Sequence, residues 1–201
     1  GGFTKVGKGT TTLSGKNTYT GETIINEGTL SVKGSLSDKT PVTVNAEGIY
    51  AVDSTDEVGS IEGSGDIVIS AGQTLTAGGL NTDTEVSGVI SGVGGFTKVG
   101  DGTTTFSGVN TYKGDTNVQS GRLALANVSA IFQESQTIVR GDGHLDLYTH
   151  SANGSIDEGK TFKIDQIDIS GSGQLSVSAR NPLVSENINL NASSGGITVE
   201  I

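Results

Sequence analysis

Apolar and polar residues alternate over very short stretches of this chain. Leu30 and Val32 flank a serine, and Leu175 and Val177 flank another. A spacing of two places apolar side chains on one face of a strand. No stretch keeps a 3.6-residue period with capping residues at both ends. The pattern therefore predicts an all-β chain with many short strands and almost no α-helix.

Glycines punctuate these runs, and the runs themselves are rich in threonine, valine and isoleucine. Such residues favour strands, and each run is too short for a helix. In the first half of the chain we predict strands at 10–13, 23–25, 29–32, 42–44, 49–52, 67–69 and 74–76.

A duplication organises the chain. Residues 1–32 align without gaps on residues 94–125, and 20 of the 32 aligned positions are identical. Internal repetition at this level is the signature of a repeat architecture. We therefore expect one β-helix segment over 1–201, with repeats at about 1–93 and 94–188 and a partial coil at 189–201.

Composition favours a stacked core over a globular one. Glycine accounts for 32 of 201 residues, and the chain has only nine aromatic residues, four Tyr and five Phe. Few turns carry the two-residue Asn-Gly or Asp-Gly signal of antiparallel hairpins. We expect a single-stranded parallel β-helix, with an antiparallel sandwich or prism as the alternative. A 93-residue repeat would give about four coils of roughly 23 residues, and the whole chain roughly eight or nine coils.

The duplicated segment resembles a known family. Lys98-Val-Gly-Asp-Gly is followed by Ser107-Gly-Val-Asn-Thr-Tyr-Lys-Gly and by Gly121-Arg-Leu. The first copy repeats this order from Lys5 to Leu30. The pattern is similar to the autotransporter-associated β-strand repeat, also called the passenger-associated transport repeat.

That resemblance implies a right-handed β-helix, exported across the outer membrane of a Gram-negative bacterium through a C-terminal barrel. Localisation at the bacterial cell surface or outside the cell follows from the same resemblance. The chain starts inside a repeat motif and contains no methionine. We therefore expect a piece of a larger passenger, without signal peptide or barrel and without membrane insertion of its own.

The repeated motif residues are expected to have structural roles. Glycines permit turn conformations, asparagines are expected to bond the backbone of their own turns, and tyrosines to cover an adjacent corner. The residues concerned are Lys5, Gly7, Gly9, Asn17, Tyr19 and Gly21, with Lys98, Gly100, Gly102, Asn110, Tyr112 and Gly114 in the second copy.

Charge limits the possible partners of the chain, and the cysteine content limits the sources of its stability. The net charge is −10 without a compact basic patch, so nucleic acid is not an expected partner. The chain has no cysteine, so packing and backbone hydrogen bonds must supply its stability. No segment shows the spacing of a cofactor or metal site.

Arg140, Gly141 and Asp142 form the sharpest local signal. An exposed Arg-Gly-Asp segment is a known ligand of integrins, because its two charges reach separate sites. The segment aligns on Asn45-Ala46-Glu47 of the first copy, which favours an ordinary turn. It remains a candidate receptor contact.

His144 and His150 are the only histidines. His144 and Asp146 share a strand face, but a metal site needs three or four converging ligands and a Ser-His-Asp triad needs a placed serine. No catalytic motif of hydrolases appears. We therefore expect no catalytic residue, no cofactor and no enzyme activity.

The leading hypothesis is a non-enzymatic passenger segment that acts as an adhesin, in self-association or as a virulence scaffold. Its partner would be a host cell-surface protein or glycan, or the same protein on a neighbouring cell. The alternative is a shed ligand that engages a host receptor, and the third possibility is the spine of a β-helix enzyme.

Overall fold

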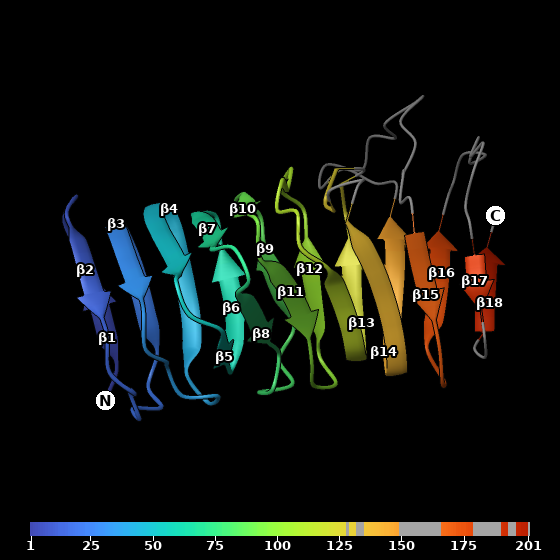
Figure 1. Ribbon diagram of the computed structural model, residues 1–201, viewed down its shortest axis with the longest axis horizontal. Helices are drawn as coiled ribbons and strands as arrows, with labels where there is room; N and C mark the ends of the chain where they lie inside the picture. Colours follow the sequence, from blue (N-terminus) through green and yellow to red (C-terminus); the bar gives the residue numbers. More distant parts are fainter. Residues whose placement is uncertain (128, 132–134, 149–165, 179–189, 193–195, 201) are drawn as a thin grey trace.

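The computed structural model of the chain describes residues 1–127, 129–131, 135–148, 166–178, 190–192 and 196–200. Within these ranges the chain is all-β and contains no helix. Figure 1 shows the strands side by side along the long axis, in sequence order from the N-terminal end to the C-terminal end. The strands are β1 (Phe3–Lys5), β2 (Thr10–Leu13), β3 (Thr23–Val32), β4 (Pro41–Val52), β5 (Asp56–Val58), β6 (Ser60–Gly63), β7 (Asp66–Ile69), β8 (Thr74–Ala77), β9 (Thr84–Val86), β10 (Ile90–Gly92), β11 (Gly95–Lys98), β12 (Thr103–Phe106), β13 (Thr116–Leu125), β14 (Gln136–Tyr148), β15 (Gln166–Ile169), β16 (Gln174–Ser178), β17 (Leu190–Ala192) and β18 (Gly196–Glu200).

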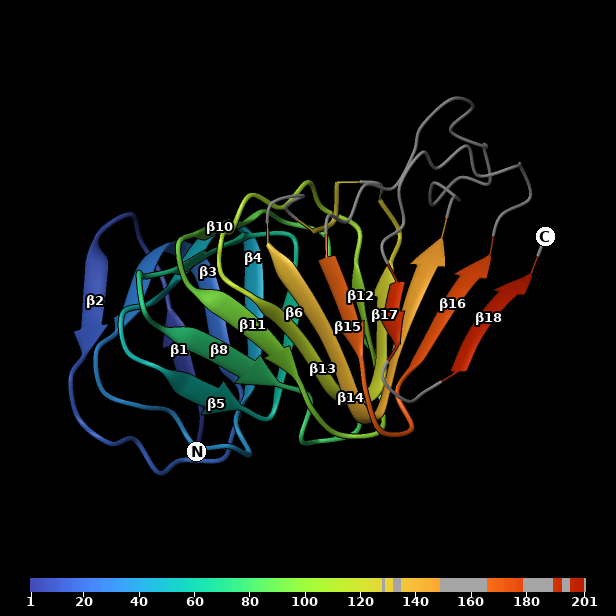
Figure 2. The ribbon, with the colours of Figure 1, turned by 45° about the vertical axis from the view of Figure 1, so that its right-hand side comes forward.

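Every strand pairing between described residues is parallel, which confirms the β-helix and excludes the antiparallel sandwich. The strands form three walls of a solenoid, and Figure 2 shows strands of different walls running in different directions. The first wall stacks β1, β3, β4, β6, β9, β12, β13, β14, β16 and β18. The second wall stacks β2, β3, β4, β7 and β10. The third wall stacks β5, β8, β11, β13, β14, β15 and β17.

Four long strands belong to two walls at once. β3 and β4 run through the corner between the first and second walls, with a register shift between Ile25 and Glu27. β13 and β14 do the same between the third and first walls, with a shift between Val118 and Ser120. The strands expected separately at 23–25 and 29–32, and at 42–44 and 49–52, are therefore continuous. The corner adds one bulged residue and keeps the backbone extended.

The coil is shorter than the roughly 23 residues expected from the repeat. Phe3 pairs with Thr23 and Thr23 with Val42, which are steps of 23 − 3 = 20 and 42 − 23 = 19 residues. The number of strands along the first wall agrees roughly with the eight or nine coils expected. The 93-residue repeat therefore contains more than the four coils expected.

The second motif copy lies on a different wall from the first. β1 pairs with β3 on the first wall, and its counterpart β11 pairs with β13 on the third wall. Fourteen wall-to-wall steps separate β1 from β11, which at three walls per coil is 14/3, or four and two-thirds coils. The expected division of the repeat into whole coils was wrong. Sequence identity gives the number of residues between the two copies, but it does not show how far the chain has turned about the solenoid axis over that distance.

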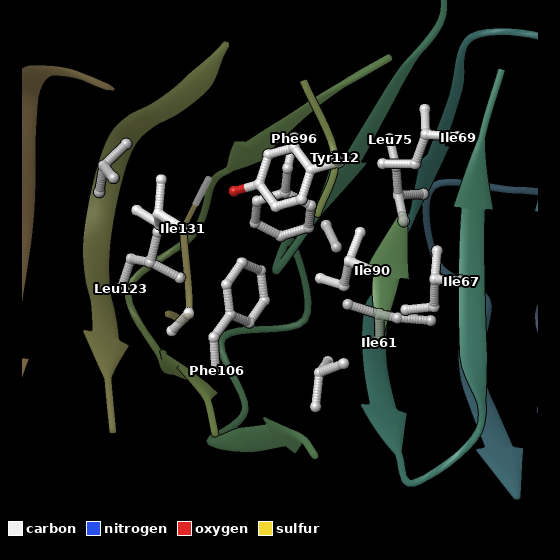
Figure 3. Packing of buried hydrophobic residues seen from close by; sticks show 14 of the residues in the cluster. Ile61, Ile67, Ile69, Leu75, Ile90, Phe96, Phe106, Tyr112, Leu123 and Ile131 are labelled. Atoms are coloured by element: carbon white, nitrogen blue, oxygen red, sulfur yellow. The ribbon is translucent and has the colours of Figure 1, made fainter. Parts of the chain in front are cut away.

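Inward side chains from all three walls fill one continuous core. Alternation along each strand puts Val, Ile and Leu inside, where full burial of one such side chain contributes about 1.5–3 kcal/mol. Figure 3 shows aromatic residues of the second copy at its centre. The rings of Phe96 and Phe106 meet edge to face, with centroids 4.9 Å apart and planes at 63°. The second motif copy thus contributes three of the nine aromatic residues of the chain to this core.

Candidate functional site

The Arg-Gly-Asp segment lies at the corner between the third and first walls, inside β14. Arg140, Gly141 and Asp142 are all exposed. Gly141 has φ +57°, a left-handed conformation that glycine adopts readily, so the two charged residues flank a tight bend. Asp142 Oδ1 accepts a hydrogen bond of 2.8 Å from the hydroxyl of Ser172 in the next coil. The segment is therefore a presented corner, as the alignment with a turn suggested.

His144 belongs to a polar cluster on the outer surface of the first wall. Its Nε2 lies 2.8 Å from Asp146 Oδ1 and 2.7 Å from the hydroxyl of Ser176. Arg122 donates from Nη1 to Asp146 Oδ2 at 2.8 Å. Register sets these contacts: Arg122 pairs with His144, and Asp146 pairs with Ser176, across three adjacent strands. His150 lies outside the described residues.

This cluster contains serine, histidine and aspartate but lacks the geometry of a catalytic triad. A triad uses one imidazole nitrogen for the serine and the other for the aspartate. Here Nε2 faces both Asp146 and Ser176. When Nε2 carries its proton toward the carboxylate, it has no lone pair to accept the serine proton. Among the described residues no group of three or more His, Cys, Asp and Glu could hold a metal ion.

The motif lysines point inward and bind backbone carbonyls at a corner. Lys98 Nζ donates to the carbonyls of Val99 and Gly100 at 2.6 and 2.8 Å. It also reaches the carbonyl of Ser120 in the next coil, at 3.4 Å. Burial lowers the pKa of the Lys98 ammonium to about 8, although the carboxylates of Asp101 and Asp83 oppose the shift. The motif lysine is thus part of the core.

The first-copy lysine makes the same set of contacts. Lys5 Nζ donates to the carbonyls of Val6 and Glu27 at 2.9 and 3.0 Å, and to the carbonyl of Gly7. Equivalent residues therefore hold equivalent corners, one between the first two coils and one in the middle of the rod. The motif was expected to have a structural role. At these corners the lysine ammonium group hydrogen-bonds to turn carbonyls that face inward.

The motif glycines either adopt a left-handed backbone conformation or allow adjacent coils to approach closely. Gly7 and Gly100 have φ of +74° and +70° at equivalent turns. A Cβ at Gly114 would lie 2.4 Å from the backbone carbon of Gly94, so the coils could not stack at that distance. A Cβ at Gly102 would lie 2.4 Å from the carbonyl oxygen of Thr82, whereas at the equivalent Gly9 it would meet nothing within 4 Å. Gly21 is similarly close to Gly1, at 2.3 Å from its carbonyl oxygen.

The motif asparagines join coils as well as turns. Asn17 Nδ2 donates to the carbonyl of Gly15 in its own turn and to that of Ser35 in the next coil, as expected in part. Asn110 differs from the expectation. Its Nδ2 donates to the carbonyl of Ala130 at 2.7 Å, and its Oδ1 accepts from the backbone N–H of Ile90 at 2.8 Å. These bonds bridge three successive coils.

The motif tyrosines pack against the hydrophobic core, Tyr19 partly buried and Tyr112 within it. Tyr112 is fully buried, and Figure 3 shows its ring beside Phe96. Its hydroxyl is 2.5 Å from the hydroxyl of Thr116, and the Tyr19 hydroxyl is 2.7 Å from that of Thr23. Burial raises the pKa of Tyr112 well above its ordinary value, although the hydrogen bond with Thr116 opposes the shift.

Sequence reasoning missed two polar residues with defined partners. Arg122 was not singled out, because its partner Asp146 lies 24 residues away and only register brings them together. Asp56 is buried and accepts from the backbone N–H of Leu36 at 3.1 Å and from the hydroxyl of Tyr50 at 3.2 Å. Burial raises the pKa of Asp56 above its ordinary value of 3.8. Its spacing of two from Val58 was the available signal that it points inward.

With the geometry of both motif copies established, their family can be stated. Residues 3–32 and 96–125 match the family described as the passenger-associated-transport-repeat. The chain carries two passenger-associated transport repeats. The matched ranges run from β1 to the end of β3 and from β11 to the end of β13, so each repeat holds the lysine corner, the asparagine and the tyrosine described above. The resemblance to autotransporter passengers is thereby confirmed.

Two curated relatives agree with this assignment. The chain is 36% identical over 129 residues to the adhesin BmaC autotransporter of Brucella suis, a match that covers 59% of the chain and 4% of the relative. It is 39% identical over 72 residues to an extracellular serine protease of Serratia marcescens, covering 35% of the chain and 7% of the relative. The chain thus spans a small part of either protein. No solved structure matches it, and no helix of the described residues is long and apolar enough to cross a membrane.

Proposed function

We propose that the chain is a non-enzymatic segment of a surface-exposed passenger, which presents side chains along its flank for adhesion, self-association or virulence. The observation that carries this proposal is the direction of the repeated side chains. Lys98 and Tyr112 are fully buried, and Asn110 bonds backbone groups of neighbouring coils. What repeats builds the rod, and so recognition is left to the outer residues that differ between the copies.

The similarity to an adhesin autotransporter over 129 residues supports this proposal. We place the chain at the bacterial cell surface or outside the cell, after export through the outer membrane. Its partner is a host cell-surface protein or glycan, or the same protein on a neighbouring cell. No part of it needs to enter a membrane or contact nucleic acid for this role.

The similarity to an extracellular serine protease supports a different candidate, in which the segment is the spine of an enzyme. The match covers 35% of the chain. In the described residues, the arrangement of His144, Asp146 and Ser176 lacks the two-nitrogen relay that a serine nucleophile needs. Any active site would then lie elsewhere in the longer protein. We favour the non-enzymatic role for this segment.

A second candidate function is engagement of a host receptor through Arg140, Gly141 and Asp142. It is favoured by one observation: both charged residues are exposed on either side of a bend at Gly141. The carboxylate of Asp142 accepts a hydrogen bond from the hydroxyl of the exposed Ser172. A shed or surface-held rod would present this corner to an integrin-like site.

Attachment of the purified chain, coupled to beads, to host cells tests adhesion directly. Saturable attachment that excess soluble chain competes away supports a host ligand, and clumping of the beads without cells supports self-association. If neither occurs, the proposed role is wrong. The Asp142→Glu variant tests the receptor corner, because glutamate keeps the charge but moves it by one methylene. Equal attachment of this variant and the parent to integrin-bearing cells would exclude the receptor contact.

A further inference from the structure

The two copies share the motif lysine, asparagine and tyrosine but differ at several outer positions. Arg122, His144 and Asp146 occupy the positions that Thr29, Ile49 and Ala51 occupy in the first copy. The registers establish this correspondence, because Thr29 pairs with Ile49 as Arg122 pairs with His144. In the same way Ser176 pairs with Asp146 where Val68 pairs with Ala51. Three neutral side chains of the first copy are thus replaced by ion-paired side chains in the second.

Burial within this cluster is layered. The side chain of Asp146 is 6% exposed, while the side chains of Arg122 and His144 are 42% and 21% exposed. The carboxylate therefore lies beneath a guanidinium and an imidazole, and each of these is held to one of its two oxygens. The guanidinium and the imidazole are thus more exposed to solvent than the carboxylate. A charge-assisted hydrogen bond to a nearly buried partner fixes the orientation of a long side chain such as arginine.

Neutral polar groups adjoin the cluster on the neighbouring strand β16. Ser176 contacts His144, and the exposed Gln174 lies next to His144 in register. The row from Arg122 through His144 to Gln174 crosses three strands, a length of about 10 Å at the usual strand spacing. This length and donor pattern fit one or two sugar residues that carry an anionic group.

We propose that Arg122, His144, Gln174 and Ser176 form a binding site for an acidic glycan, one that carries carboxylate or sulfate groups. Asp146 is its positioning residue, because it binds Arg122 and His144 and fixes the orientation of both side chains. The chain has a net charge of −10, so attraction by overall charge opposes such binding. Recognition then depends on placed donors. The proposal rests on the proposed binding function and names its ligand class.

Binding of the intact chain to defined oligosaccharides tests the site, with a heparin-derived octasaccharide, an oligogalacturonate and neutral maltooctaose as probes. We expect binding to one or both acidic probes and none to maltooctaose. A sulfate-specific and a carboxylate-specific site are distinguished by which acidic probe is retained. Absence of binding to both acidic probes, or equal binding to maltooctaose, overturns the proposal. Cell attachment is measured separately, so its failure would bear on the adhesive role and not on this site.

Three variants locate the binding. Arg122→Gln is expected to weaken it at least about tenfold, because a charge-assisted hydrogen bond is lost. Asp146→Asn makes the chain less acidic, so binding by charge alone would become tighter. A positioned site predicts weaker binding, because Arg122 and His144 lose their anchor. Lys39→Gln removes one exposed charge from another part of the rod and should leave binding unchanged.

Circular dichroism and thermal unfolding must show that each variant is folded. If Asp146→Asn fails to fold, Arg122→Gln and His144→Gln decide the matter, since neither buries a new group. Tighter binding by Asp146→Asn, or an equal loss with Lys39→Gln and Arg122→Gln, would sink the proposal.

Discussion

Asn110 donates from its side-chain amide to the carbonyl of Ala130, 2.7 Å away and one coil further along the rod. The same amide accepts from the backbone N–H of Ile90 one coil earlier. Three coils are thus joined by one side chain that is almost completely buried. The equivalent Asn17 is half-buried, and its side-chain amide donates to the carbonyls of Gly15 and Ser35.

This difference predicts unequal costs for the same substitution. Asn110→Ala leaves a buried N–H and a buried carbonyl without partners, so we expect a loss of about 2–4 kcal/mol in the free energy of unfolding. Asn17→Ala should cost no more than about 1 kcal/mol, because water can reach its former partners. Denaturant unfolding of both variants checks this. Equal losses would show that the bridge between coils is unimportant.

A second matched pair tests close approach between coils. Gly102→Ala places a Cβ 2.4 Å from the carbonyl oxygen of Thr82, and the backbone must shift. We expect destabilisation of about 1–3 kcal/mol, as for overpacked cores. Gly9→Ala at the equivalent position meets nothing within 4 Å and should change the melting temperature very little. A larger fall for Gly9→Ala than for Gly102→Ala would contradict the coil spacing.

Lys98 makes stability depend on pH in the alkaline range. Its pKa is about 8 in the folded chain and 10.5 in the unfolded one. Between these values the unfolded state binds the proton that the folded state has released, so stability rises as pH increases. Relative to Lys98→Met, the parent should gain free energy of unfolding from pH 7 to pH 9.5, a range below the ordinary tyrosine pKa of 10. Parallel profiles for the two proteins would disprove this.

Asp56 should give the opposite dependence of stability on pH, in the acidic range. Because burial raises its pKa above 3.8, the folded state holds a proton that the unfolded state has released. Stability therefore increases as pH falls through the raised pKa and stops increasing below 3.8. Compared with Asp56→Asn, whose side chain does not titrate, the parent should become relatively more stable as the pH is lowered from 6 to 4. Urea unfolding at several pH values measures the difference, and a constant difference would argue against a buried carboxylate.

The fold was largely predictable from the sequence because its signals are local. The alternation around Leu30 and Val32 and the punctuating glycines act within a few residues. The wall on which a strand lies depends instead on the sum of all preceding coil lengths. Gly63 pairs with Val86 after 23 residues, where neighbouring coils take 19 or 20, so a small error in each coil moves a residue to another wall.

The candidate site was harder to predict for the same reason. The Arg-Gly-Asp corner is contiguous in sequence and was found. Arg122, Asp146 and Ser176 are separated by 24 and 30 residues, and the second interval includes a long coil that partly lies outside the described residues. No local pattern links an arginine to a serine two strands away. Only parallel register brings their side chains together.

The offset of four and two-thirds coils has a consequence for any longer array of such units. Each added unit of this kind would turn its successor by a third of a revolution about the rod axis. Outer side chains inherited from one ancestral unit would then lie along a helical path around the rod and face three directions in succession. Three units would complete 3 × 14/3 = 14 coils and bring the fourth back into phase with the first. Growth by duplication would in this way let one rod meet partners from every side.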